Sequence, residues 1–466
     1  MSLVRSRYNF FAMDEEGGVA IFNARVGSLL RLEGADSVAL AENLVKSVAV
    51  FDASDVPSTL LTELVRNNFL VDSAFDELTA IRKRFQDARE DTPLVLTITT
   101  TMDCNLGCYY CYESRTKEQL NFEDISSLVA FTRERIASSS KRSLHVDWYG
   151  GEPFLNVEFL EAASFALQKL CEELGARFVS SVISNGTKWT ADIAGFVRAH
   201  RVRQVQISFD GLDVNHNKRR HYRKKYIEAI TSFDSAVQVV DALVNVCRVD
   251  IRFNVDRRNI SDLLPFIEMC ADRGWFDAPH PAVFQPARIS AYTKKSEFLR
   301  AHELTLSEFD NLRGSVRRAL KGRAKVEESE VPDGFPRPKT SVCAALSNSS
   351  RVVGADGLIY RCGLQVGEKH RSVGSLTGDP KSYPAQPNDQ TWWKAFDPTT
   401  LPTCSKCSFL PICWGGCPKK QLERDDAAIA RQSEYWRTNL PRLIATKAGL
   451  KNVVKPLLDE TDQFRN

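Results

Sequence analysis

Three cysteines lie close together in the stretch Cys104-Asn-Leu-Gly-Cys108-Tyr-Tyr-Cys111, separated by three and by two residues. Thiolate sulfur is a soft ligand, and iron–sulfur clusters are held by cysteine thiolates. Three such ligands can hold three irons of a cubane and leave the fourth iron open for a substrate or cofactor. A structural zinc site would need a fourth ligand and a different spacing. The loop therefore favours an iron–sulfur cluster over zinc or three ordinary buried cysteines.

Six more cysteines lie in the C-terminal part of the chain. They are Cys343, Cys362, Cys404, Cys407, Cys413 and Cys417. The last four have the spacing Cys-x2-Cys-x5-Cys-x3-Cys, with turn formers such as Pro411 and Gly415 beside them. A pair of cysteines with two residues between them also suits tetrahedral zinc, so zinc stays an alternative here. The other three, Cys171, Cys247 and Cys270, fall in helical patterns and are predicted to be small buried hydrophobic residues.

The first cysteine loop lies in a segment, residues 93–290, in which strand and helix patterns alternate. The expected strands are Leu94–Thr100, Leu144–Tyr149, Phe178–Ser184, Val205–Phe209, Val249–Val255 and Pro281–Gln285. The expected helices are Glu123–Ala137, Glu158–Leu174, Ala191–His200, Ser232–Cys247 and Ser261–Arg273, with another after residue 300. This alternation predicts an α/β fold with a parallel sheet and right-handed crossovers. Sites in such sheets lie at the carboxyl ends of the strands, where the cysteine loop falls.

The cysteine loop resembles the signature loop of radical S-adenosylmethionine (SAM) enzymes, in which an aromatic residue, here Tyr110, precedes the third cysteine. The resemblance implies a partial (βα)6 barrel and a [4Fe–4S] cluster on Cys104, Cys108 and Cys111. In that family the reduced cluster cleaves bound SAM to a 5′-deoxyadenosyl radical, which abstracts hydrogen from an unactivated carbon. The cofactor supplies this chemistry, and the protein supplies position and the exclusion of water.

The same resemblance assigns SAM-binding residues to successive strand ends. Gly150-Gly151-Glu152 matches a motif that meets the methionine amino group, which agrees with a carboxylate opposite an ammonium and with glycines that admit a close backbone. The remaining candidates are Ser184, Asn185, Ser208, Asp210, Arg220 and Asn254. In relatives the arginine binds the cofactor carboxylate, although here Asn217 replaces the usual Asp before it and Arg219 stands beside it. Several of these residues would also suit plain turns.

The C-terminal cysteines resemble the SPASM domain, which usually binds two auxiliary [4Fe–4S] clusters. The family's pairing implies Cys343, Cys362 and Cys417 for one cluster and Cys404, Cys407 and Cys413 for the other. The family's seventh cysteine should follow Cys417, and no cysteine follows it here. An oxygen ligand from Asp425, Asp426 or Glu434, or an open iron, would then complete the set.

Residues 1–90 read as a separate unit. Arg7–Ala12 and Val19–Asn23 are expected to be strands, and the expected helices are Val26–Leu32, Ser37–Val48, Ser58–Asn68, with Ser58 as N-cap, and Glu77–Arg89. The pattern resembles the winged-helix-like leader-binding domain of peptide maturases, which can add a leader strand at its sheet edge; a plain structural cap is the alternative.

The predicted domains are 1–90 leader recognition, 91–295 partial barrel, 296–342 helical linker, 343–435 irregular iron–sulfur (SPASM) domain and 436–466 tail.

Composition limits the classes of partner. The chain has 466 residues and a formal net charge of +3, which gives no reason to expect nucleic acid or an anionic membrane. The sequence shows no signal peptide and no apolar run long enough to span a bilayer. We therefore expect a cytoplasmic protein, in whose compartment thiols stay reduced. An electron donor such as flavodoxin or ferredoxin is implied by the resemblance.

The leading functional hypothesis is a maturase that crosslinks or otherwise oxidises a ribosomally made precursor peptide. An anaerobic sulfatase maturase, which forms formylglycine, is the first alternative; in that subfamily an Asp follows the second SPASM cysteine, where this chain has Gly363. The second alternative is a non-enzymatic metal-binding scaffold. The sequence names no general base, although Asp147, Asp256 and Arg288 lie near strand ends. The basic run Lys218–Lys225 could contact an acidic leader or be a solvated face.

Overall fold

The computed structural model describes residues 2–34, 36–46, 51–52, 54, 56–323, 334–378, 387–451 and 453–455. The chain forms two compact units. The barrel unit comprises Thr92–Val331 and Ser347–Trp393, and the terminal unit comprises Met1–Asp91, Pro332–Leu346 and Lys394–Asn466. The five predicted domains stay a prediction; residues 324–333 of the predicted linker and 456–466 of the predicted tail lie outside the described residues.

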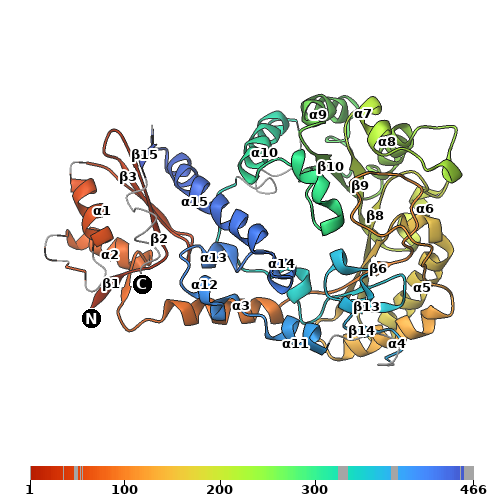
Figure 1. Ribbon diagram of the computed structural model, residues 1–466, viewed down its shortest axis with the longest axis horizontal. Helices are drawn as coiled ribbons and strands as arrows, with labels where there is room; N and C mark the ends of the chain where they lie inside the picture. The colour runs from red at the N-terminus through yellow and green to blue at the C-terminus, as the bar shows by residue number, and fades with distance from the viewer. Residues whose placement is uncertain are drawn as a thin grey trace. The chain divides into compact units, whose positions relative to one another are not determined.

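The barrel unit is built on a nine-stranded sheet with the strand order β11-β10-β9-β8-β7-β6-β12-β13-β14 (Figure 1). Its parallel strands in chain order are β6 (Leu94–Thr99), β7 (Ser143–Tyr149), β8 (Arg177–Ser184), β9 (Val202–Phe209), β10 (Arg248–Val255) and β11 (Val283–Arg288). Because β11 ends the sheet without pairing to β6, the barrel is partial. The α/β fold class and the six predicted strands are confirmed.

Helices follow the strands as the alternation predicts. They are α4 (Asp124–Ala137), α5 (Val157–Glu173), α6 (Ile193–Ala199), α8 (Ser232–Leu243), α9 (Leu263–Asp272) and α10 (Leu306–Leu320). Helix α10 begins with a capping box in which Thr305 and Glu308 satisfy each other's backbone amides. The short helix α7 (Asp213–Arg219) was not predicted, because its seven residues are mostly polar and carry no apolar repeat.

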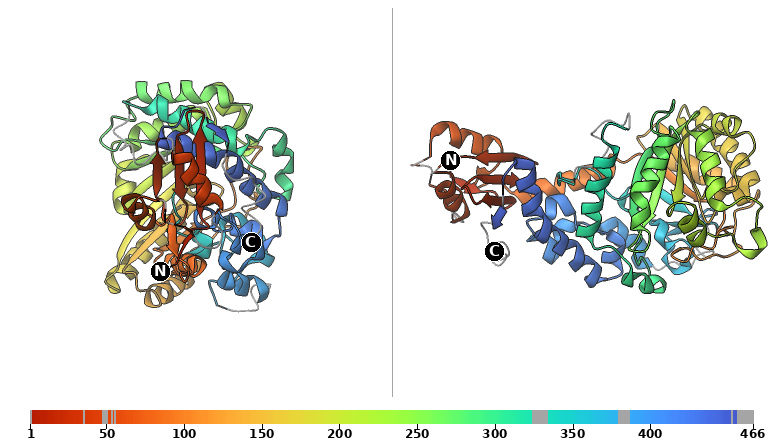
Figure 2. Two further views of the ribbon diagram at one scale, coloured as in Figure 1. Left: turned by 90° about the vertical axis from the view of Figure 1, so that its left-hand side faces the viewer. Right: turned by 90° about the horizontal axis from the view of Figure 1, so that it is seen from above.

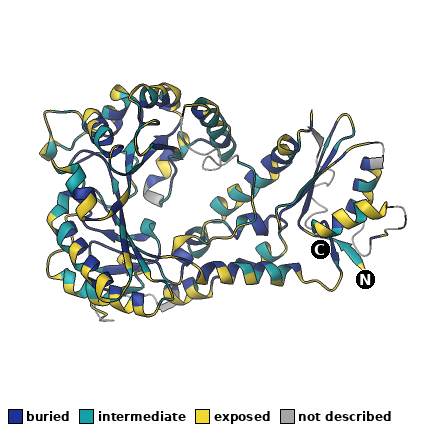
Figure 3. Ribbon diagram, turned by 180° about the vertical axis from the view of Figure 1, so that it is seen from behind, coloured by how far each residue is buried: buried dark blue, intermediate teal, exposed yellow. Residues whose placement is uncertain are grey.

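The two faces of the parallel sheet differ in chemistry. Along β7 the residues Leu144, Val146 and Trp148 are buried, whereas the alternate residues are half-buried. The buried set packs with α4, α5 and the other helices into one continuous apolar core, and the strands appear dark blue and teal in Figure 3 while the helices carry the exposed yellow faces. The opposite, inner face of the barrel carries polar side chains such as Asp147 and Gln206, which leaves it open to a polar ligand.

Three short strands extend the sheet beside β6. Strand β12 (Arg351–Val353) pairs with β6 in parallel, and β13 (Leu358–Tyr360) and β14 (Gly374–Ser375) follow in antiparallel register. Cys362 lies just after β13. The segment that follows it approaches the cysteine loop, because a Cβ on Gly367 would lie 3.8 Å from Met102.

The terminal unit contains a four-stranded antiparallel sheet with the order β15-β2-β3-β4 and a separate pair, β1 with β5. The strands are β1 (Leu3–Arg5), β2 (Asn9–Asp14), β3 (Val19–Asn23), β4 (Leu29–Leu32), β5 (Leu70–Asp72) and β15 (Val453–Lys455). The helices are α1 (Asp36–Lys46), α2 (Ser58–Arg66), α3 (Glu77–Glu90), α12 (Pro402–Ser405), α13 (Leu410–Cys413), α14 (Pro418–Leu422) and α15 (Asp426–Ala448). Helix α11 (Pro387–Ala395) spans the boundary between the units. Figures 1 and 2 show β15 beside the N-terminal strands.

Two local predictions for this unit were wrong. Val26–Leu32 is not a helix, because Leu29–Leu32 pairs with β3 and Gly27, at φ 85°, turns the chain between the two strands. Ser58 is the first residue of α2 rather than its N-cap; the preceding residue is Pro57, and no side chain caps the helix. The winged-helix-like character of residues 1–90 stays a prediction, and residues 47–48 of the predicted helix Ser37–Val48 lie outside the described residues.

Candidate active site

The cysteine loop follows β6 and is anchored on both sides. Asp103 accepts hydrogen bonds from Arg223 Nη1 at 2.6 Å, Lys225 Nζ at 2.7 Å and the Tyr226 hydroxyl at 2.6 Å. Burial alone would raise the pKa of Asp103, but these three hydrogen bonds hold it at about 2. On the other side, the Gly107 amide donates to the His221 carbonyl at 2.8 Å. These contacts fix the backbone that carries the three cysteines.

The three thiols lie in surroundings that favour their neutral form. Burial raises the pKa of Cys104 and of Cys108, and it raises the pKa of Cys111 to about 11. Asn185 Nδ2 donates to Cys104 Sγ at 3.7 Å. A positively charged iron cluster would supply the field that keeps such thiols ionised. Three free cysteines in one loop are the soft sulfur donors that an iron–sulfur cluster takes.

Gly150 and Gly151 let the end of β7 lie directly against the cysteine loop. A Cβ on Gly150 would stand 2.3 Å from the Thr101 carbonyl oxygen, and one on Gly151 would stand 2.2 Å from that of Asp103. The Gly151 and Glu152 amides donate to these same two carbonyls at 2.9 and 3.0 Å. The two glycines were expected to let the backbone approach a ligand. They also let the end of β7 approach the backbone of the cysteine loop.

Glu152 is fully buried at this junction. Its carboxylate accepts from the Ser184 hydroxyl at 2.9 Å, from the Asn185 amide at 2.7 Å and from the Phe154 amide at 3.3 Å. Burial raises the pKa of Glu152 to about 7, although these hydrogen bonds act in the opposite direction. Among the described residues no cation forms an ion pair with it, so the site suits a cationic amine.

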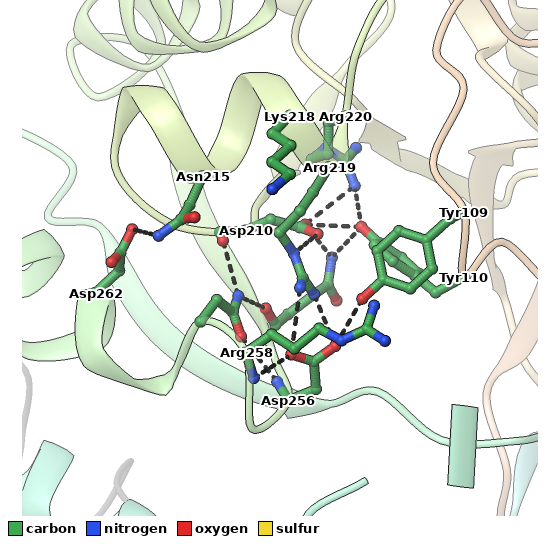
Figure 4. Close-up of polar contacts among 12 residues, drawn as sticks. Tyr109, Tyr110, Asp210, Asn215, Lys218, Arg219, Arg220, Asp256, Arg258 and Asp262 are labelled. Carbon is green, nitrogen blue, oxygen red and sulfur yellow. Dashed lines mark hydrogen bonds and ion pairs between the residues drawn. The ribbon is translucent and has the colours of Figure 1, made fainter. Parts of the chain in front are cut away.

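Asp210 is the centre of a second buried cluster (Figure 4). Its Oδ1 atom accepts from the Tyr110 hydroxyl at 2.7 Å and from Asn254 Nδ2 at 3.2 Å, and Arg220 Nη1 lies 3.5 Å away. Its Oδ2 atom accepts from Arg219 Nε at 3.1 Å. The cluster joins the cysteine loop to the ends of β9 and β10.

Arg219, Asp256 and Tyr109 complete this cluster and were missed as site residues. Arg219 donates to both carboxylate oxygens of Asp256, at 3.2 and 3.1 Å, and the Tyr109 hydroxyl donates to Asp256 at 2.7 Å. Despite burial, the two carboxylates raise the pKa of Arg219, so the guanidinium stays charged. The available signal was position, since Asp256 directly follows β10 and Arg219 precedes the predicted Arg220.

Arg220 retains donor capacity. Its Nη1 atom donates to the Tyr110 hydroxyl at 2.7 Å, whereas its Nε atom is buried without a hydrogen-bond partner among the described residues. A buried unpaired donor is costly, and a bound carboxylate would satisfy it. Arg220 thus fits the predicted contact with the carboxylate of SAM.

The other predicted SAM contacts divide into two groups. Ser184, Asn185 and Asn254 hold Glu152 or Asp210 by the hydrogen bonds given above. Asp210 itself is wholly engaged by four side chains, which favours a supporting role over direct contact with ribose. Ser208 is half-buried on the inner face of β9. The assignment of all these residues to SAM stays a prediction.

The basic run Lys218–Lys225 does not form one cationic face. Arg219 and Arg220 are buried in the Asp210 cluster, and Arg223 and Lys225 bind Asp103. Of the run's lysines and arginines, Lys218 and Lys224 alone are exposed and in no ion pair with another described residue. Most of the positive charges that would have to bind an acidic leader are therefore buried or already paired.

The six C-terminal cysteines are divided between the two units. Cys404, Cys407 and Cys413 lie in the terminal unit, where burial and the charges of Cys407 and Cys404 raise the pKa of Cys413 to about 11. Cys343 and Cys417 also belong to the terminal unit, whereas Cys362 belongs to the barrel unit. In the described part of the chain no three His, Cys, Asp or Glu side chains are gathered as around a single metal ion. The ligand sets stay a prediction.

Residues 98–265 match the radical SAM superfamily. These residues form a radical SAM domain. In sequence, the chain is 24% identical to mycofactocin maturase MftC of Mycolicibacterium smegmatis over 339 residues, which cover 70% of this chain and 78% of MftC.

Two solved structures share the fold of this chain. Native anSMEcpe with bound AdoMet gives a TM-score of 0.55 at 20% identity, covering 77% of this chain and 100% of that one. Streptococcus suis SuiB bound to precursor peptide SuiA gives a TM-score of 0.50 at 14% identity, covering 89% and 95%. The radical SAM domain uses a [4Fe–4S] cluster and SAM, which argues against a non-enzymatic scaffold. No helix among the described residues is long and apolar enough to cross a membrane.

Proposed function

We propose that the chain matures a ribosomally made precursor peptide by forming a crosslink or a related oxidative modification. The observation that carries this proposal is the barrel-end site, in which the cysteine loop lies against buried Glu152 and the Arg220 cluster. The similarity to MftC across most of both chains supports the peptide as substrate class. The fold shared with SuiB in its complex with a precursor peptide supports it further.

The chain's own residues would position the cofactor by charge. When bound, the cluster and SAM supply a 5′-deoxyadenosyl radical that abstracts a hydrogen atom. Glu152 would hold the amino group of SAM, and Arg220 would hold its carboxylate through the donor that is otherwise unpaired. The fixed orientation of Arg220 comes from Tyr110 and Asp210. Such preorganised charges lower the cost of orienting a reactive cofactor.

Further parts of the proposal rest on the family resemblance. Cys404, Cys407 and Cys413 would hold an auxiliary [4Fe–4S] cluster, which would supply an electron acceptor for the oxidation of the peptide. Residues 1–90 would bind the leader of the precursor peptide. A flavodoxin or ferredoxin would reduce the first cluster, and the reducing cytoplasm suits all of these thiolates.

The test is peptide-dependent turnover by the anaerobically reconstituted full chain. A short peptide encoded beside this gene is incubated with SAM and dithionite, and 5′-deoxyadenosine and the peptide mass are measured. We expect the peptide to stimulate 5′-deoxyadenosine formation and to lose hydrogen atoms in pairs. The variant C104A/C108A/C111A is the control and should form neither product. An unmodified peptide with no stimulation would contradict the proposal.

The sulfatase-maturase alternative is tested in the same assay. A sulfatase-derived peptide with the target Cys or Ser replaces the precursor peptide, and formylglycine is sought by mass. We expect none, because Gly363 provides no carboxyl group where that subfamily has an Asp. Formylglycine formation would select the alternative.

A further inference from the structure

The inner face of the barrel carries a carboxylate that the site described so far does not use. Asp147 lies on β7 in register with Thr97 of β6 and Ser181 of β8. The Ser181 hydroxyl donates to Asp147, and the Thr97 hydroxyl donates to it at 3.4 Å. His145 Nε2 lies 3.2 Å from Asp147 Oδ1 and 3.0 Å from Ser181 Oγ. Three neighbouring strands thus hold one carboxylate–imidazole pair.

This pair is partly exposed on the inner face of the sheet. The Asp147 and His145 side chains are 27% and 33% exposed, although both lie in the middle of a strand that is covered on its other face by helices. Two residues further along the same face, Tyr149 contacts Tyr112 and Glu113, which directly follow Cys111. Successive residues on one face of a strand are about 7 Å apart. Asp147 therefore lies one such step along β7 from Tyr149, the residue that contacts the segment after Cys111.

Other charged residues near the strand ends are committed to partners. Asp256 binds Arg219 through both oxygens, and Arg288 donates to the Leu304 carbonyl at 2.7 Å. Asp250, also on the inner face, is buried and accepts from Arg248 at 3.0 Å. Asp147 has no arginine or lysine within ion-pair distance among the described residues, and its ionisable partner is His145. Two hydroxyls and an imidazole therefore hold its carboxylate, and no arginine or lysine of the described residues does.

We propose that Asp147, positioned by Ser181 and coupled to His145, accepts the proton that the precursor peptide releases after hydrogen abstraction. This inference rests on the proposed function. Each oxidation of the peptide removes a hydrogen atom, one proton and one electron. The hydrogen atom would go to the 5′-deoxyadenosyl radical and give 5′-deoxyadenosine, the proton would go to Asp147, and the electron would go to an oxidised iron–sulfur cluster. The pair of electrons of the broken X–H bond stays with the peptide and forms the new bond to the carbon radical.

The experiment measures modified peptide formed per 5′-deoxyadenosine. A general base typically contributes about 10²–10⁴-fold to its step. In Asp147→Asn we expect peptide-dependent 5′-deoxyadenosine formation to persist while this ratio falls at least about tenfold. Asp147→Glu should restore part of the ratio. His145→Gln, a second variant that leaves the carboxylate in place, should lower it by a smaller factor.

Three readouts separate this role from a structural one. Asp250→Asn removes an inner-face carboxylate that is already paired and should leave the ratio near that of the wild type. Iron content and the affinity for a fluorescent precursor peptide should not change in Asp147→Asn. A wild-type ratio in both Asp147→Asn and His145→Gln, or an equal fall in Asp250→Asn, would overturn the inference. A wild-type enzyme without peptide-dependent 5′-deoxyadenosine would instead overturn the proposed function.

Discussion

The hydroxyl of Tyr110 lies 2.7 Å from Arg220 Nη1 and 2.7 Å from Asp210 Oδ1, so one atom of the cysteine loop bridges a buried cation and a buried anion. Tyr110 was predicted as a cofactor residue only because its position in the loop resembles an aromatic of the family. The geometry gives it a second task, which is to orient the arginine that would meet the SAM carboxylate.

We expect Tyr110→Phe to weaken SAM binding while the cluster stays in place. Removing the hydroxyl leaves a buried donor and a buried acceptor without that partner, which costs about 1–3 kcal/mol. Part of this cost should appear as a roughly tenfold loss of SAM affinity in isothermal titration calorimetry. The matched control is Tyr109→Phe, which releases Asp256 instead and should affect SAM affinity less. Equal losses in both variants would contradict the assignment.

We expect Gly151→Ala to disturb the cysteine loop. The new Cβ would stand 2.2 Å from the Asp103 carbonyl oxygen, and backbone atoms cannot move aside as a flexible side chain can. Overpacking of this kind costs about 1–3 kcal/mol, so the melting temperature and the iron content should both fall. Gly314→Ala is the control, because its nearest atoms are 3.6 Å away and belong to arginine side chains. A variant that melts and loads iron like the wild type would refute this account.

SAM affinity should decrease as the pH falls through about 7. Burial raises the pKa of Glu152 to about 7, so below that pH the carboxyl group of the free enzyme holds a proton. A bound ammonium favours the ionised carboxylate, and the proton must then leave when SAM binds. The affinity should therefore fall by up to about tenfold per pH unit below 7. The amine of SAM loses its own proton near pH 8, so calorimetry is carried out between about pH 6 and about pH 7.5.

The matched variant for the pH experiment is Glu152→Gln. It should bind SAM weakly at every pH in this range, and its affinity should not show the acid limb. If the wild-type affinity were flat, or if the variant kept the same acid limb, Glu152 would not be the group that meets the amine.

Iron content should report the cysteine sets one by one. Three cubanes correspond to about twelve irons per chain, and C104A/C108A/C111A should retain about eight of them. C404A/C407A/C413A should also retain about eight while keeping SAM cleavage, because the first cluster is intact. Zinc in place of iron at the C-terminal cysteines would remove the auxiliary redox role. A wild type with about eight irons would mean that one auxiliary set is empty.

The barrel could be predicted closely because each strand and helix has a strong local pattern. The strand Leu144–Tyr149 alternates between buried and half-buried residues. The cysteine loop, which follows the neighbouring strand, has a specific spacing of its cysteines. The Asp210 cluster could not be predicted in the same way, since Arg219 and Asp256 are 37 residues apart and meet only because β9 and β10 are adjacent in the sheet. Val26–Leu32 was misread because its apolar residues suit a helix, whereas pairing with β3 decides its conformation.

Strand β15, near the C-terminus, is the edge strand next to β2 in the sheet that also contains β3 and β4. The sheet is therefore completed late in synthesis. When a ribosome has produced the first 91 residues, the edge of β2 that β15 will occupy is still vacant. It stays so until residues 453–455 emerge, by which time all segments of the barrel unit are available to fold. An unpaired strand edge invites intermolecular pairing. A nascent chain that stalls before β15 would therefore expose an unpaired edge of β2.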